Sequence, residues 1–121
     1  MISAGVILTI GARVLLLQGA RSGIWSFPKG HPEIADRGSA LMTAVRETFE
    51  ETGYIPGVDY TICDQRRIGK RKYWQAQPIR ELPAPTLDPR EHKAWRWATM
   101  NEIAWLNVNS DVAQWSRSLS S

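Results

Sequence analysis

The stretch AVRETFEETGY, residues 44–54, places three glutamates, Glu47, Glu50 and Glu51, within five positions. If this segment is helical, the three carboxylates share one arc of roughly 100°, because successive residues turn by about 100°. Like charges three and four residues apart repel, at a cost of about a few tenths of a kcal/mol per pair. The helix macrodipole also disfavours negative charge near a C-terminus. The cluster therefore costs stability unless a cation binds it.

A helix over this stretch is predicted from its ends and its periodicity. Ser39 is a suitable N-cap, and Gly53 stands where helices commonly end in the left-handed conformation, so we predict a helix from Ser39 to about Thr52. One mostly apolar face recurs at helical spacing and consists of Leu41, Ala44, Val45, Thr48, Phe49 and Thr52. We expect this face to be buried, with the glutamates on the opposite side of the helix.

The rest of the chain is typical of a mixed sheet with few helices. The predicted strands span residues 3–10, 13–20, 59–68, 72–79 and 93–98, with tight turns at Gly11-Ala12 and around Gly69. Residues 21–38 are mostly loop, and residues 81–91, with three prolines, form an exposed irregular connection. The pattern predicts an α/β (α+β) fold, with residues 1–121 as one domain.

The C-terminal quarter holds two further helix signals. Thr99 and Glu102 form a capping-box pattern, which predicts a short helix from that point. In the tail, Val112, Trp115 and Leu119 fall on one helical stripe. Among the six tryptophans, Trp95, Trp97 and Trp115 are predicted to be core residues, whereas the positions of Trp25 and Trp74 stay open.

Composition limits the class of protein. The 121 residues are 43% apolar and carry a formal charge of +3, which is ordinary for a globular domain and only mildly favours anionic ligands. The single cysteine, Cys63, cannot form an intrachain disulfide, which favours a reducing cytoplasm, and we interpret it as a small core residue. Neither apolar run near the N-terminus approaches the roughly 18 residues that a membrane span needs.

A divalent cation is the ligand that would explain the glutamate cluster. Mg²⁺ prefers oxygen ligands, keeps several waters and is usually held by a few carboxylates together with substrate phosphates. Carboxylates at i, i+3 and i+4 on a rigid helix leave coordination positions for water and phosphate oxygens, as metal-assisted phosphate chemistry requires. A solvated acidic helix face is the alternative interpretation.

The segment GHPEIADRGSALMTAVRETFEETGY, residues 30–54, resembles the signature of the Nudix hydrolases, written G-x5-E-x7-R-E-U-x-E-E-x-G-U with U a bulky apolar residue. The second half of that signature matches at the right spacing through Arg46, Glu47, Glu50, Glu51 and Gly53. Upstream, WSFPKGHPE is similar to the family's W-x-x-P-K-G-H-x-E entry. The resemblance implies a Nudix-type α/β/α sandwich with a mixed sheet and a catalytic loop-helix.

The match departs from the signature in the loop. Gly30 lies sixteen residues before Arg46, where the signature has fourteen, so the loop is two residues longer. Counted back from Arg46, the signature's first glutamate falls on Gly38, and Asp36 and Glu33 are the acids that could replace it. In the family this position supports the loop more than it holds the metal, so we expect weakened geometry and not lost activity.

The resemblance also implies roles. Glu47, Glu50 and Glu51 would be catalytic metal ligands, Gly30 would belong to the same metal site, and Arg46 would orient one of the glutamates. One carboxylate must accept the proton of the attacking water. The segment EHKAWRW, residues 91–97, resembles the E-H-x-x-x-R-W segment of the animal and archaeal-type diadenosine tetraphosphate hydrolases, in which this glutamate, here Glu91, contributes to the metal site.

Several residues are candidates for substrate binding. Lys29 and His31 flank the glycine that opens the loop and could meet a phosphate, whereas His92 is interpreted as a surface residue. The basic run RRIGKRKYW, residues 66–74, could hold a polyphosphate tail or simply protect a sheet edge. Its candidate residues are Arg66, Arg67, Lys70, Arg71 and Lys72 for phosphate, and Tyr73 or Trp74 for stacking on a base.

We therefore predict a cytoplasmic hydrolase, dependent on Mg²⁺ or alternatively Mn²⁺, that cleaves a phosphoanhydride bond in a nucleoside diphosphate linked to another moiety. Dinucleoside polyphosphates such as diadenosine tetraphosphate are the first substrate hypothesis. Removal of pyrophosphate or a cap from RNA 5′ ends and hydrolysis of inositol pyrophosphates are alternatives, as is a nucleotide-binding module with weakened catalysis. A homodimer, with no membrane partner, is the expected association.

Overall fold

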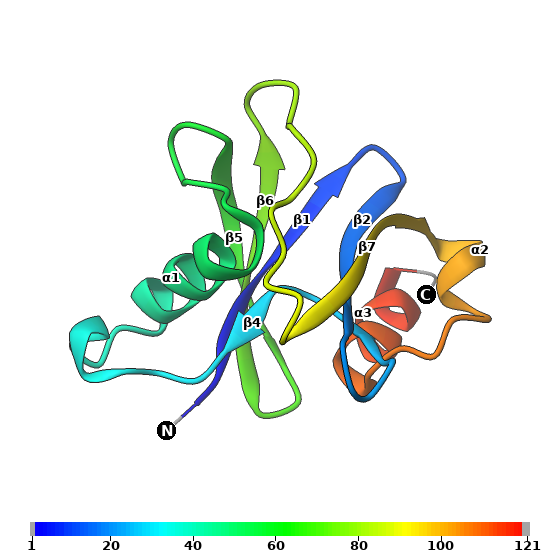
Figure 1. Cartoon of the computed structure of the whole chain (residues 1–121), viewed down its shortest axis with the longest axis horizontal. Helices are drawn as coiled ribbons and strands as arrows, with labels where there is room; N and C mark the ends of the chain where they lie inside the picture. Colours follow the sequence, from blue (N-terminus) through cyan, green and yellow to red (C-terminus); the bar gives the residue numbers. More distant parts are fainter. Residues whose placement is uncertain (1, 120–121) are drawn as a thin grey trace.

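The computed structural model describes residues 2–119, within which strands and helices follow one another along the chain (Figure 1). The strands are β1 (Ala4–Ile10), β2 (Arg13–Gly19), β3 (Trp25–Ser26), β4 (Lys29–Gly30), β5 (Tyr60–Ile68), β6 (Arg71–Pro78) and β7 (His92–Thr99). The helices are α1 (Ala40–Thr52), α2 (Met100–Ile103) and α3 (Ser110–Leu119), and a 3-10 turn, η1, covers Ile34–Asp36. No helix in this part of the chain is long and apolar enough to cross a membrane.

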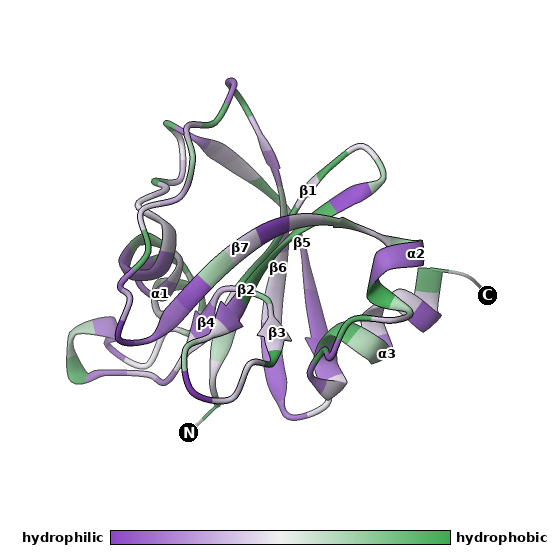
Figure 2. Cartoon of the chain, turned by 45° about the vertical axis from the view of Figure 1, so that its right-hand side comes forward, coloured by the Kyte–Doolittle hydropathy of each residue, from purple (hydrophilic) through white to green (hydrophobic). Residues whose placement is uncertain are grey.

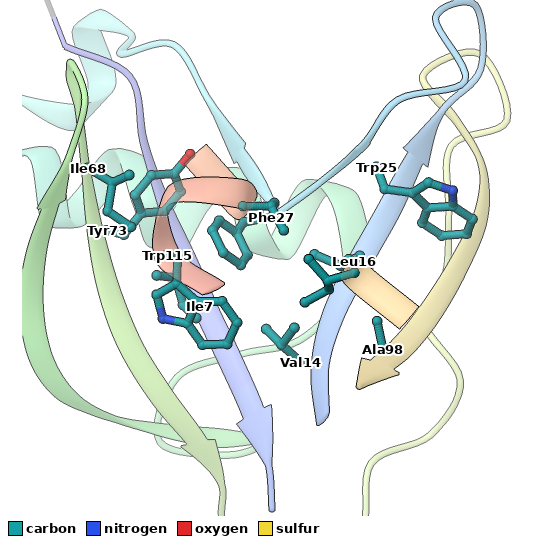
Figure 3. Close-up of a cluster of buried hydrophobic side chains, with 11 residues drawn as sticks. Ile7, Val14, Leu16, Trp25, Phe27, Ile68, Tyr73, Ala98 and Trp115 are labelled. Carbon is teal, nitrogen blue, oxygen red and sulfur yellow. The ribbon is translucent and has the colours of Figure 1, made fainter. Parts of the chain in front are cut away.

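Strand β1 organises a mixed sheet. It runs parallel to β6 and antiparallel to β2 and β4, while β5 extends the sheet beyond β6, and β3 and β7 both pair with β2. The paired residues of β1 and β2 lie only at their hairpin end, where Thr9 faces Val14. Beyond that point the two strands diverge, and Phe27 lies between them (Figure 3).

Helices cover both faces of this sheet, so the molecule has three layers (Figure 2). On the α1 side, Val6 and Leu8 of β1 pack with Ala44 and Tyr54. On the other side, where α2 and α3 lie, the core contains Ile7, Phe27, Tyr73, Val112 and Trp115 (Figure 3). The Phe27 ring meets Tyr73 and Trp115 edge to face, at centroid distances of 5.2 and 5.6 Å. Such pairs add about 0.5–1.5 kcal/mol each beyond the burial of their area.

The predicted element boundaries are largely confirmed. Helix α1 begins after Ser39, whose hydroxyl accepts from the Met42 amide, and ends at Gly53, which has φ of 83°. The Thr99–Glu102 capping box is present at α2. Gly11 and Gly69 lie in the two hairpin turns with positive φ. The proline-rich connection is irregular, as predicted, but part of it packs: Pro85 is buried and the Thr86 amide donates to the Thr52 carbonyl.

The buried face of α1 differs from the prediction. Phe49 is 51% exposed and Leu41 is 38% exposed, whereas Ala44, Thr48 and the supposedly outward Glu51 are buried. Helix α1 rests on the sheet through small side chains, which lets it lie close to β1 and β4. The side of α1 around Phe49 therefore faces outward, and Glu47 and Glu51 lie toward the sheet, whereas Glu50 is exposed.

Two further burial predictions are wrong. Cys63 is exposed, because β5 has an irregular register between Ile62 and Asp64 that leaves Cys63 without a partner on β6. Trp95 is 40% exposed, whereas Trp115 is buried as predicted and Trp97 is partly buried in the core on the α1 side. On β7, Ala94 and Ala98 supply the inward positions on the α3 side.

Candidate active site

The carboxylates of α1 meet the backbone of β4. Glu51 is buried, and its Oε1 accepts a hydrogen bond from the Lys29 amide at 3.2 Å. Glu47 packs against Gly30, where an added Cβ would lie 1.8 Å from Glu47 Oε2. Position 30 must therefore lack a side chain for Glu47 to occupy this place. The glycine that opens the signature is explained here by close approach of a carboxylate.

Arg46 connects the acidic helix to the loop before it. Its Nε and Nη2 donate to the two carboxylate oxygens of Asp36 at 2.9 Å each, and Nη2 also donates to the His31 carbonyl. Its Nη1 donates to Glu50 at 3.1 Å, which confirms the predicted contact between Arg46 and one of the glutamates. The bidentate pairing of Arg46 with Asp36 fixes the guanidinium in one orientation.

Asp36, and not Glu33, supports the loop. Asp36 is 3% exposed and also accepts from the Thr43 hydroxyl and the Glu33 amide. Glu33 lies 3.4 Å from Arg46 with a side chain that is 60% exposed. Counting forward from Gly30 reaches Asp36 at the signature's acid position, whereas counting back from Arg46 reaches Gly38. The two additional residues therefore lie between Asp36 and Arg46.

The loop accommodates the two additional residues through left-handed backbone conformations. Arg37 has φ of 54° and Gly38 has φ of 77°, so two consecutive residues are left-handed. They separate the turn that carries Asp36 from Ser39, the cap of α1. In the longer loop Asp36 still binds Arg46 through both carboxylate oxygens. The weakened loop geometry that was expected is therefore not seen.

The pKa values of Glu47 and Glu51 are raised. Burial raises the pKa of Glu47 to about 7, with the charge of Glu50 adding to the effect and Arg46 opposing it. Burial raises the pKa of Glu51 to about 8, and the charge of Glu47 adds to that shift. Carboxylates crowded in this way are typical of functional sites, where a bound cation offsets their repulsion.

A cleft beside Glu51 contains the next group of residues. Glu51, Lys29, Glu91 and His92 line it together with Ser26 and the loop at 19–22. Glu91 lies in the same cleft as Glu51, and its charge adds to the raised pKa values of Glu47 and Glu51. His92 is half-buried and not the surface residue that was predicted, and burial lowers its pKa.

The donor set fits a hard divalent cation, although it is not gathered around one point. Among residues 2–119, no three His, Cys, Asp or Glu side chains are already arranged to hold a metal ion. The charge of Glu47 raises the pKa of Glu51, while Glu50 is turned toward Arg46. Oxygen donors that repel one another next to an open cleft suit Mg²⁺ or a similar ion.

The candidate phosphate-binding residues divide between two faces of the sheet. His31, Arg67, Lys70 and Arg71 line one pocket, on the side of α3. Lys72 lines a different pocket near Ser39, on the side of α1. Arg66 donates to the Ser118 hydroxyl at 2.8 Å. The side chains of the basic run are therefore distributed over both faces of the sheet.

The aromatic residues considered for stacking on a base are buried or partly buried. Tyr73 is fully buried between β1 and α3, so its predicted stacking on a base is incompatible with this structure. Trp74 is partly buried in the core on the α1 side, and Trp25, whose position was open, is buried. Asp111, which binds Tyr73 and Arg71, had no signal in the sequence beyond its place in the first turn of a helix.

A family model of the NUDIX domain matches residues 1–119, and the chain therefore belongs to the Nudix hydrolases. The asymmetrical bis(5′-nucleosyl)-tetraphosphatase of Sus scrofa is 38% identical, over 81% of this chain and 71% of the pig protein. The enzyme of the same name from Mus musculus is 36% identical, over 76% of this chain and 67% of the mouse protein.

Solved structures show the same fold. An Ap4A hydrolase binary complex from C. elegans has a TM-score of 0.76 and 24% identity, covering 98% of this chain and 95% of that one. A Nudix hydrolase from M. smegmatis has a TM-score of 0.74 and 22% identity, covering 98% and 83%. The mixed sheet with helices on both faces is thus the Nudix fold.

Proposed function

We propose that this protein is a Mg²⁺-dependent hydrolase of dinucleoside polyphosphates, with diadenosine tetraphosphate as its first substrate. The observation that carries this proposal is the pair of glutamates, the partly buried Glu47 and the buried Glu51, set against the β4 backbone beside a cleft that also contains Lys29 and Glu91. The names of the pig and mouse relatives support the choice of substrate.

The residues of this site have distinct proposed roles. Glu47, Glu50, Glu51 and Glu91, with Gly30, would hold the cation, which supplies charge neutralisation and polarises phosphate oxygens when bound. Arg46, fixed by Asp36, keeps Glu50 near the cluster. Glu47 or Glu51, which lie against the β4 backbone, would accept the proton of an attacking water. Lys29 lines the same cleft and would neutralise a phosphate.

The test is turnover of a nucleotide panel with Mg²⁺ or Mn²⁺, with products separated by anion exchange. The panel contains diadenosine tetraphosphate, nucleoside triphosphates, an ADP-sugar, triphosphorylated RNA and an inositol pyrophosphate. Selective cleavage of diadenosine tetraphosphate to ATP and AMP supports the proposal. Glu50→Gln should lose this activity, whereas Glu81→Gln, an exposed acid near Gly11 at the far end of the sheet, should keep it.

Metal binding can be measured apart from turnover. A bound ion stabilises the folded state, by about 2.7 kcal/mol when its concentration is one hundred times its Kd. Millimolar Mg²⁺ should therefore raise the melting temperature of the wild type but not that of Glu50→Gln. A wild type indifferent to both Mg²⁺ and Mn²⁺ would contradict the metal site and favour a nucleotide-binding module. Cytoplasmic location and a homodimer stay predictions.

A further inference from the structure

Asp111 is a buried acid outside the proposed metal site. It lies in the first turn of α3, is 3% exposed, and faces two residues of β6. Arg71 Nη1 donates to its Oδ2 at 3.0 Å, and the Tyr73 hydroxyl donates to the same oxygen. Because Arg71 and Tyr73 are two positions apart on one strand, they point to the same face of the sheet.

Docking of α3 alone does not require this carboxylate. Val112 and Trp115 of α3 already bury apolar surface against Phe27 and Tyr73. Taking a charge out of water costs several kcal/mol unless it is paired, and a buried ion pair is often no more stabilising than apolar residues in its place. What distinguishes this carboxylate from other buried acids is the residue that it contacts, because Arg71 lines a basic pocket.

Arg71 lies at the border of a basic pocket. Its lining includes His31, Arg67 and Lys70 together with Ser3 and Asp111. His31 directly follows Gly30, against which Glu47 packs, so the basic pocket adjoins the acidic cluster. The side chain of Arg71 is 35% exposed, so the guanidinium is anchored on one side and accessible on the other.

The strand register supports this placement. Lys29 pairs with Gly5, and Gly5 pairs with Tyr73, so the three residues form one row across β4, β1 and β6. Arg71 lies two residues before Tyr73 on β6, so its side chain is on the same face of the sheet as this row.

We propose that Asp111 is a positioning residue that acts through Arg71. It holds the guanidinium at the edge of the basic pocket, where the phosphoryl groups of the substrate farther from the metal site would lie. This inference rests on the proposed function for its substrate. It assigns α3 a part in recognition of long polyphosphates, although α3 contributes no metal ligand.

The test is a double-mutant cycle with Asp111→Asn and Arg71→Gln, because two residues that act as a unit have non-additive effects. Asp111→Asn should raise KM for diadenosine tetraphosphate about ten-fold while kcat stays within about two-fold, since a coupling of this size is common between contacting residues. In the Arg71→Gln background the same substitution should change KM by less than about two-fold.

Asp59→Asn is the matched control. Asp59 is also 3% exposed and also paired with an arginine, Arg80, but it lies at the other end of the sheet. An equal rise of KM in Asp59→Asn, or an equal effect of Asp111→Asn in both Arg71 backgrounds, would overturn the proposal. If Asp111→Asn does not fold, Arg71→Lys keeps the charge, removes the fork geometry and should raise KM by itself.

A second readout separates this inference from the proposed function. The Kd of inorganic tripolyphosphate, measured by calorimetry without a divalent metal, should weaken in Asp111→Asn but not in Asp59→Asn. If the wild type cleaves no dinucleoside polyphosphate, the proposed function fails, and the tripolyphosphate cycle still decides the role of Asp111. Unchanged tripolyphosphate affinity in Asp111→Asn, with normal turnover by the wild type, refutes only the positioning role.

Discussion

Two buried aspartates, one in the turn before α1 and one in the loop after it, have nearly the same chemistry. Asp36 and Asp59 are each 3% exposed, each bonded to an arginine, and each accepts a backbone amide. Arg46, the partner of Asp36, also contacts Glu47 and Glu50 of the proposed metal site, whereas Arg80, the partner of Asp59, has no such neighbours among its described contacts. A buried ion pair therefore does not by itself indicate a functional site. The further contacts of its arginine give that indication.

The largest expected effect lies inside the site. Glu51→Gln should lower kcat roughly 10²–10⁴-fold, because it removes a group proposed to bind metal and accept a proton. Its melting temperature without metal should not fall, because the neutral amide relieves the repulsion with Glu47. Steady-state kinetics and thermal unfolding measure the two effects. A variant with normal kcat would remove Glu51 from the mechanism.

The next effect tests the comparison directly. Asp36→Asn should lower kcat/KM roughly 10–100-fold, as loss of groups that orient metal ligands typically does. Asp59→Asn should leave kcat/KM within about two-fold, because no contact of Arg80 within residues 2–119 joins it to the site. Both variants should be less stable, as judged by urea unfolding. Equal kinetic losses in the two variants would show that stability, and not the next contact of the arginine, controls activity.

Acid should affect both pairs alike. The hydrogen bond from Arg46 is the largest cause holding the pKa of Asp36 well below its ordinary 3.8, and the Ile55 amide is the largest cause lowering that of Asp59. A lowered folded-state pKa contributes stability that is full above the unfolded pKa and is lost as pH falls through the folded value.

The free energy of unfolding should therefore fall as pH drops below about 4, and it should fall less in the Asp36→Asn/Asp59→Asn double variant. Urea unfolding followed by tryptophan fluorescence between pH 6 and pH 3 measures this. Identical pH slopes in the wild type and the double variant would contradict it. Because the pH effect concerns stability alone, the two single variants should behave alike here and differ only in catalysis.

The smallest effect concerns one glycine near each aspartate. Gly38 and Gly57 have φ of 77° and 81°, and an added Cβ at either position meets nothing within 4 Å. Alanine at either site should cost about 1 kcal/mol from the left-handed backbone alone. Chemical denaturation measures both. A much larger cost at Gly38, with loss of activity, would show that the loop after Asp36 is held more tightly than the loop before Asp59.

The sequence predicted elements well because their limits are set locally. A serine cap and a left-handed glycine bound α1, and positive-φ glycines bound the two hairpins. The sequence did not predict correctly which side of α1 faces the sheet, because Leu41, Val45 and Phe49 form its more apolar side by composition. In the structure the small residues Ala44 and Thr48 face the sheet instead. The close approach that they allow brings Glu51 to the Lys29 amide.

Within the site, spacing predicted more than residue type did. The spacing of Arg46 and the three glutamates identified the acidic cluster, of which Glu47 and Glu51 lie against β4 and Glu50 is bonded to Arg46. The burial of Tyr73 depends on tertiary packing, and the exposure of Cys63 depends on a strand irregularity. No local sequence pattern indicates either. The role of Asp36 required knowing on which side of it the two additional residues lie.

The brevity of β4 has a consequence for which length changes this chain can accept. Gly30 faces Glu47, and the pleat of a strand sends its neighbour Lys29 toward the opposite face. One residue inserted just before β4 would exchange these two positions and press a side chain into the carboxylates. Two residues added after Asp36 are accommodated by two left-handed residues without moving the acid from Arg46. The chain can therefore vary in length after this strand, but not immediately before it.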